Sequence, residues 1–193
     1  MRTGIFGGSF DPPHKGHIKI ALTAKDELGL DRIIMVPTGQ APHKPDIAAE
    51  TSHRVNMCRT LCEKYGFELS LYEAGKEGNC YTADLLEHFA TVYPEDEFFL
   101  IVGGDSLDYM DKWHQPERIF KSCRVVVARR SGTNDEKAGF LRETYNAEII
   151  FLNSGLFDIS STEVREKISQ GQSFLEFTEP ETAEYIMENN LYR

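Results

Sequence analysis

Short apolar runs alternate with amphipathic helical patterns along the whole chain, and this alternation limits the fold more than any other feature. The runs are short, mostly β-branched or aromatic, and bounded by turn residues, which is typical of strands. They are Thr3–Phe6, Arg32–Val36, Phe67–Tyr72, Phe98–Val102, Arg124–Ala128 and Glu148–Leu152. The patterns between them predict helices over His17–Leu28, Thr51–Tyr65, Tyr81–Tyr93, Asp135–Tyr145, Ser161–Gln170 and Pro180–Asn189. The alternation predicts an α/β fold with a parallel sheet that is covered by helices on both faces.

Length and charge restrict the classes of function. The chain has 193 residues, which suits a single domain over 1–193. Its 21 lysines and arginines against 31 acidic residues give a net charge of −10, which argues against nucleic acid as a general partner. A small phosphorylated ligand would need a local positive pocket.

Targeting and metal signals are weak. No apolar run approaches the roughly 20 residues of a membrane span, and the N-terminus lacks the order of a signal peptide, so we expect a cytoplasmic protein without a membrane partner. The four cysteines form no CxxC pair, and we interpret them as reduced, partly buried thiols. A zinc site would need further ligands at suitable spacing.

The turn after the first strand is the first candidate site. It reads GGSFDPPHKGH over residues 7–17, and its two glycines let backbone approach a ligand closely. His14 and His17 then lie three residues apart at the start of a helix, where unpaired amides and the helix dipole favour anions. Gly16 removes a side chain that would otherwise stand between them and a ligand. We interpret the pair as donors to phosphate oxygens, against a polar loop or half of a metal site.

The turn before the helix over Ser161–Gln170 is the second candidate site. Ser160 and Glu163 fit the capping-box pattern, which predicts a helix beginning at Ser161. The amides and hydroxyls of Ser161 and Thr162, with Arg165 on the same face, could hold a pyrophosphate. Taken alone, the pattern also fits a well-capped surface helix.

These two motifs resemble the nucleotidylyltransferase superfamily, with its HxGH and ISSTxxR signatures. More closely, the chain is similar to the bacterial nicotinate-nucleotide adenylyltransferases, and the resemblance covers nearly the whole sequence. It includes Pro42-His43-Lys44, Tyr81-Thr82, Gly103-Gly104-Asp105-Ser106, Lys112-Trp113 and Asn189-Asn190-Leu191-Tyr192.

The resemblance implies a Rossmann-like, doubly wound sheet of about six mainly parallel strands, with ATP over the first and fourth. It implies catalytic roles for His14, His17 and Arg165, the histidines at the phosphates and the arginine on the leaving pyrophosphate. Further ATP contacts would come from Gly7, Gly8, Ser9, Phe10, Lys44, Gly103, Asp105, Ile159, Ser160, Ser161 and Thr162. Nicotinate mononucleotide would be bound by Thr82, Tyr109 and Trp113. Trp113 could instead be a packing residue, and Tyr109 could be a core tyrosine.

The implied reaction joins the AMP part of ATP to the 5′-phosphate of nicotinate mononucleotide and releases pyrophosphate. Magnesium would be bound mainly by the ATP phosphates, without a dedicated protein ligand. Adenylyl transfer to nicotinamide mononucleotide or phosphopantetheine, a non-catalytic nucleotide sensor, and a zinc-binding protein remain alternatives. The family analogy also allows a homodimer.

Overall fold

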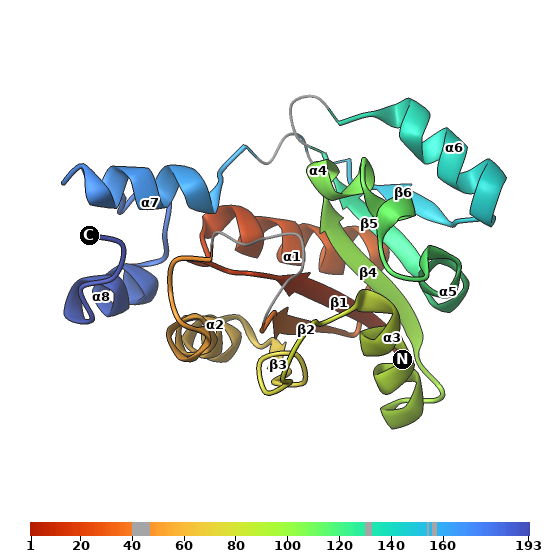
Figure 1. Cartoon of the computed structure of the whole chain (residues 1–193), viewed down its shortest axis with the longest axis horizontal. Coiled ribbons are helices and arrows are strands. Elements are labelled where there is room, and N and C mark those ends of the chain that lie inside the picture. Colours follow the sequence, from red (N-terminus) through yellow and green to blue (C-terminus); the bar gives the residue numbers. More distant parts are fainter. Residues whose placement is uncertain (40–46, 130–132, 154, 156–157) are drawn as a thin grey trace.

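The computed structural model describes residues 1–39, 47–129, 133–153, 155 and 158–193, and these residues form a parallel sheet between layers of helices (Figure 1). Within the described residues the sheet has six strands in the order β3-β2-β1-β4-β5-β6, and every neighbouring pair is parallel. The strands are β1 (Arg2–Gly8), β2 (Arg32–Pro37), β3 (Glu68–Leu69), β4 (Glu97–Gly103), β5 (Arg124–Ala128) and β6 (Ile149–Phe151). This arrangement confirms the predicted Rossmann-like fold class.

The order of the strands reverses between β1 and β4, which pair directly from Arg2↔Glu97 to Phe6↔Ile101. The chain builds outward from β1 on one side and then returns to build outward from β4 on the other. Connections on the two sides therefore leave the sheet in opposite directions, and in open α/β sheets ligands bind beyond the carboxyl ends of the strands at such a switch point.

The helices cover both faces of the sheet, as predicted. They are α1 (Lys15–Leu28), α2 (Thr51–Tyr65), α3 (Thr82–Val92), α4 (Gly104–Leu107), η1 (Met110–Lys112), α5 (Pro116–Ser122), α6 (Asp135–Tyr145), α7 (Ser161–Ser169) and α8 (Pro180–Glu188). Alternate residues of each strand point to opposite faces. In β4, Leu100 packs toward α3 and α5, whereas Ile101 packs toward α1 and α2.

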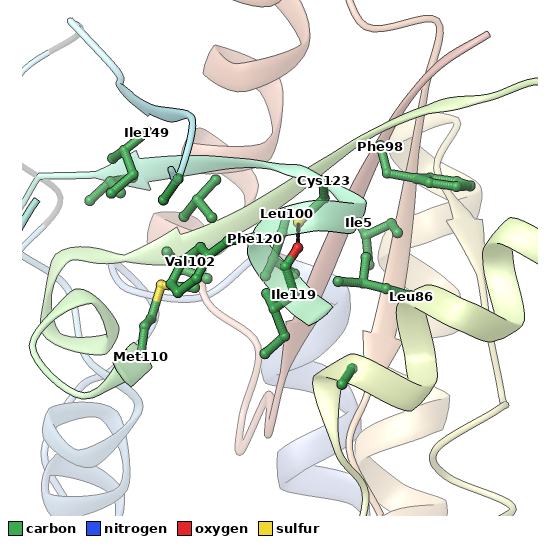
Figure 2. Close-up of a cluster of buried hydrophobic side chains, with 14 of the residues drawn as sticks. Ile5, Leu86, Phe98, Leu100, Val102, Met110, Ile119, Phe120, Cys123 and Ile149 are labelled. Carbon is green, nitrogen blue, oxygen red and sulfur yellow. Dashed lines mark hydrogen bonds between the residues drawn. The ribbon is translucent and has the colours of Figure 1, made fainter. Parts of the chain in front are cut away.

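The core on the α3–α5–α6 face is continuous from Phe98 to Ile149 (Figure 2). Ile119 of α5 and Val125 of β5 are fully buried there. The Cys123 thiol donates to the carbonyl of Ile119, so this cysteine ends α5 inside the core. All four cysteines are buried and free, in agreement with the interpretation from sequence. Among the described residues, no helix has the length and apolar character that a membrane span needs.

A third, smaller core joins α7 and α8 to the rest of the molecule. Met57 of α2 packs with Val164 of α7 and Ile186 of α8, and all three side chains are buried. The C-terminal helices are therefore fixed beside α2, next to the end of the sheet where β1 enters α1.

Three differences from the predicted elements have physical reasons. Phe67–Tyr72 is a strand only at Glu68–Leu69, because the chain turns back at Leu71, whose carbonyl accepts from the amide of Gly75. Glu148–Leu152 shortens to Ile149–Phe151 at the opposite sheet edge. The helices α4, η1 and α5 were not predicted, because helices of seven residues or fewer are too short for a periodic apolar pattern.

The turn after β3 contains a buried carboxyl group. Glu73 is 4% exposed, and its Oε2 has no hydrogen-bond partner among the described residues. Burial raises the pKa of Glu73 to about 7, and Lys76 opposes the shift only in part. A group whose pKa is higher in the folded state than in the unfolded state binds protons on folding, so its contribution to stability falls as the pH rises from about 4.5 to about 7.

Glu73→Gln should therefore stabilise the protein more at pH 8 than at pH 5, because the amide cannot ionise. The gain relative to wild type should grow by about 2.5 kcal/mol across this range, measured by urea unfolding at both pH values. The exposed neighbour provides a matched control, Glu77→Gln, which should follow wild type at both. An equal gain at pH 5 and pH 8 would contradict the assignment.

Candidate functional site

The carboxyl ends of β1 and β4 present glycines at the point where the strand order reverses. β1 ends at Gly8 and β4 ends at Gly103, and α4 begins directly after Gly103. A Cβ on Gly7 would meet nothing within 4 Å, so the backbone there borders open space. A ligand beyond these strand ends could therefore come close to the main chain at this turn.

The two histidines of the first turn are held against each other at the start of α1. His14 is the N-cap residue, and its ring stacks on that of His17 with the centroids 3.7 Å apart. The backbone amide of His14 donates to Nδ1 of His17 at 3.1 Å. A neutral His17 must then carry its proton on Nε2, so the tautomer is fixed by the backbone. His17 is half-buried, whereas His14 is 1% exposed, so His17 is the more accessible imidazole.

Gly16 is required by packing between the two turns. A Cβ at this position would lie 2.9 Å from Nδ1 of His14 and 3.3 Å from Cβ of Ile159. The missing side chain therefore makes room for the His14 ring and for the second turn, and its predicted benefit to a ligand stays a prediction.

Phe10 supports the first turn from inside the protein. Its φ of 48° lies in the left-handed region, which is unusual for a bulky residue. Its fully buried ring packs edge-on against Phe6 and His17. The predicted contact of Phe10 with a nucleotide stays a prediction, and the structure gives this side chain a packing role.

The second turn begins α7 as the sequence predicts. The Ser160 hydroxyl accepts from the amide of Glu163 at 3.2 Å, so Ser160 is the N-cap and α7 begins at Ser161. Nη2 of Arg165 donates to the Thr162 hydroxyl at 3.4 Å, on the same side of the helix. The helix therefore presents its N-terminal amides and a guanidinium group toward one place.

The two turns are in direct contact although they lie about 150 positions apart. The Ser161 hydroxyl donates to the carbonyl of Pro12 at 2.9 Å. Nη1 of Arg165 donates to the carbonyl of Asp11 at 2.8 Å. The N-termini of α1 and α7 consequently converge, and two positive helix ends share one region of an otherwise acidic protein.

A buried pair of charges supports both turns, and the sequence analysis missed it. Arg54 is 1% exposed and donates to the carbonyls of Ser9, Gly39 and Ala49. Asp11 is 2% exposed and accepts from the amide of Ala49 at 3.0 Å. Burial lowers the pKa of Arg54, and the Asp11 carboxylate acts against that shift. The available signal was an arginine inside the apolar stripe of α2.

The residues predicted to bind the mononucleotide come from two neighbouring segments. Thr82 is the first residue of α3, and Trp113 follows η1 and packs half-buried against the core. The rings of Tyr81 and His114 lie 4.3 Å apart, so the chain neighbours of Thr82 and Trp113 are in contact. Tyr109 is 59% exposed, which excludes the reading of it as a core tyrosine.

The remaining predicted residues are less informative. Asp105 is exposed on α4, directly after the end of β4. Lys44 lies outside the described residues. Within the part of the chain that the structure describes, no group of three or more histidine, cysteine or acidic side chains is arranged to hold a metal ion.

Comparison with known proteins agrees with the geometry. The cytidylyltransferase-like family model matches residues 5–167. A protein of Chlorobaculum parvum named "Probable nicotinate-nucleotide adenylyltransferase" is 38% identical over 202 residues, covering 100% of both proteins. One of the same name from Clostridium tetani is 36% identical over 198 residues, covering 100% of this chain and 99% of that protein.

A solved structure also matches. The nicotinic acid mononucleotide adenylyltransferase of Plasmodium falciparum, complexed with NaAD, superimposes with a TM-score of 0.81 at 20% identity. The match covers 99% of this chain and 97% of that one. At this identity the similarity supports the fold, and the assignment to a family depends on the sequence matches.

Ser160→Ala should destabilise the protein by about 1 kcal/mol, because α7 loses its side-chain N-cap. Ser169, at the other end of the helix, donates to the carbonyl of Glu166 within its own turn. Ser169→Ala is therefore the matched control and should cost less than about 0.5 kcal/mol. Equal urea midpoints for the two variants would contradict the capping role.

Proposed function

We propose, on the premise that this chain belongs to the cytidylyltransferase-like family and within it to the nicotinate-nucleotide adenylyltransferases, that it transfers AMP from ATP to nicotinate mononucleotide. The products are nicotinate adenine dinucleotide and pyrophosphate, which gives the enzyme a place in NAD biosynthesis. The observation that carries the proposal is the convergence of two helix N-termini, with His17 on one side and Arg165 on the other.

The chemical step is a direct displacement at phosphorus. An oxygen of the mononucleotide 5′-phosphate forms a bond to the α-phosphorus of ATP, while the bond from that phosphorus to the bridging oxygen breaks. The electron pair of the broken bond leaves with pyrophosphate. Both reactants are anions, so the protein must align them and offset their repulsion. Alignment alone can lower the barrier by about 7–11 kcal/mol in favourable cases.

The residues divide this work by position. His17 donates through Nε2 to an oxygen of the reacting phosphates, because its Nδ1 is held by the backbone amide of His14. Arg165 and the amides of Ser161 and Thr162 bind the phosphates that leave. Gly7 and Gly8 let the nucleotide lie close to the end of β1, with Gly103 and Asp105 beside the adenosine.

The acceptor substrate binds at the segments that Tyr81 and His114 bring together. Thr82 offers the N-terminal amides of α3 to the ring carboxylate, and the half-buried face of Trp113 stacks on the pyridine ring. Tyr109 is exposed beside them and able to close over the ligand.

The proposal also covers the metal ion, Lys44, the domain organisation, the cellular location and the oligomeric state. A magnesium ion held mainly by the ATP phosphates and water would neutralise charge on the leaving group. Lys44 reaches the phosphates from the segment between β2 and α2. Residues 1–193 form one domain, and the enzyme works in the cytoplasm. A homodimer is proposed by analogy with the family.

A pyrophosphate-release assay with ATP and each acceptor in parallel tests the function. Nicotinate mononucleotide should give the highest kcat/KM, ahead of nicotinamide mononucleotide and phosphopantetheine. His17→Ala should lower kcat by about 10²–10³-fold with an unchanged circular-dichroism spectrum, because one donor to the developing charge is lost. His53→Ala is the matched control, since His53 pairs with Tyr185 away from the two turns. Turnover by His17→Ala near that of the control would refute the role of His17.

Trp113→Ala should raise KM for nicotinate mononucleotide about tenfold and leave KM for ATP within twofold, because a lost ring stack costs about 1–3 kcal/mol. Trp113→Phe keeps a flat ring and should recover most of the affinity. If alanine leaves the mononucleotide KM unchanged, the indole is a packing residue only.

A further inference from the structure

Tyr192 links the C-terminal segment to the first turn of the site. Its phenol hydroxyl donates to Oδ1 of Asp11 at 2.9 Å, across 181 positions of sequence. Asp11 is almost fully buried, and no role in the reaction has been given to Tyr192 so far. The reaction as described above therefore does not explain why a phenol hydroxyl donates to this carboxylate.

The Asp11 carboxylate joins several segments that surround the phosphate site. It accepts from the amides of Ala48 at 2.7 Å and Ala49 at 3.0 Å, just before α2. Its Oδ2 lies 3.7 Å from Nη1 of Arg165, which is too long for a good hydrogen bond. The same nitrogen donates instead to the Asp11 carbonyl. The guanidinium is thus close to a full negative charge without being tightly paired to it.

The hydroxyl of Tyr192 is well suited to keep the Asp11 carboxylate from pairing tightly with Arg165. Burial, and then the nearby Asp11 carboxylate, raise the pKa of the phenol far above its ordinary value. The group therefore stays protonated and remains a donor at every working pH. Together with the amide of Ala49 it occupies Oδ1, and so helps to hold the carboxylate in the rotamer that leaves Oδ2 to the amide of Ala48.

The backbone at Tyr192 has an unusual conformation, which places its hydroxyl at this contact. Its φ is 64°, a left-handed conformation that an L-residue retains only when its surroundings fix it. Its ring packs against the cluster that joins α7 and α8 to α2, together with Leu191. The position of the hydroxyl is therefore set by the C-terminal core.

We propose that Tyr192 is a positioning residue of the ATP site: its hydroxyl holds the Asp11 carboxylate away from Arg165, so that the guanidinium remains available to the triphosphate. Without the hydroxyl, the carboxylate can turn toward Arg165 and form a closer ion pair that competes with the substrate phosphates. This proposal rests on the function proposed above and adds a residue to it.

Tyr192→Phe removes only the hydroxyl and is the direct test. KM for ATP should rise about five- to tenfold, while KM for nicotinate mononucleotide stays within twofold of wild type. The second measurement is calorimetric binding of inorganic tripolyphosphate, which needs no turnover. Its affinity should fall by a similar factor.

Tyr185→Phe is the matched control. Tyr185 lies on α8 of the same C-terminal unit, and its hydroxyl bonds to His53 and Asn56 on α2. This variant loses two hydrogen bonds, so its melting temperature should fall at least as far as that of Tyr192→Phe. Its KM for ATP and its affinity for tripolyphosphate should match wild type.

Two results would overturn the proposal. One is an unchanged KM for ATP and unchanged tripolyphosphate affinity in Tyr192→Phe. The other is an equal loss in Tyr185→Phe, which would make the effect one of general stability. Failure of the proposed function can be told apart from failure of the Tyr192 proposal, because it would appear as absent turnover in the wild-type protein. In that case tripolyphosphate binding would still compare the two tyrosine variants.

Discussion

Two hydrogen bonds between distant turns hold together the region that we propose as the phosphate site. Ser161 to the Pro12 carbonyl and Arg165 to the Asp11 carbonyl bring the N-termini of α1 and α7 together. Each helix end carries the equivalent of about half a positive charge, and a fully exposed end would lose most of its effect to solvent. At the carboxyl ends of the central strands, the two helix ends and one guanidinium gather positive charge in one place, beside the single carboxylate of Asp11. The site proposed for the ATP phosphates depends on this convergence.

This arrangement needs a rigid support, and the buried pair Arg54 and Asp11 supplies it. A buried charge is costly unless it is fully hydrogen-bonded. Arg54 meets that requirement by donating to the carbonyl of Ser9 in the β1–α1 connection and to the carbonyls of Gly39 and Ala49 in the β2–α2 connection. It also donates to the Thr51 hydroxyl at the start of α2. The cost of burying the guanidinium is thus offset only when both connections are in their native positions. The pair consequently favours one arrangement of the site over loosely packed alternatives.

The sequence predicted the elements with strong periodicity and the turns with distinctive residues. Thr51–Tyr65 and Asp135–Tyr145 were predicted with their observed bounds, and the class and covering of the sheet are confirmed. The contacts inside the site could not be predicted in the same way. They join irregular segments such as Asp11 and Tyr192, where no period relates the partners. The burial of His14 and the packing reason for Gly16 likewise depend on how two turns meet, which one segment alone does not specify.

A net charge of −10 would repel an anionic substrate if it were spread evenly, so the position of the acidic groups matters. Several of them lie at the amino ends of the strands, where they are paired. Asp96 bonds to Thr3, to the N-terminal amine and to Arg32, and Arg124 bonds to Glu97 and Glu148. Burial alone would raise the pKa of Asp96, but these hydrogen bonds outweigh it and hold the pKa at about 2. The acidic groups at the amino ends of the strands are therefore paired with cations, and they lie at the far end of the sheet from the carboxyl ends of the strands. At moderate ionic strength, charges are screened over about 10 Å, so these acidic groups have little effect at the proposed phosphate site. An acidic protein can therefore hold an anion at the carboxyl ends of its strands.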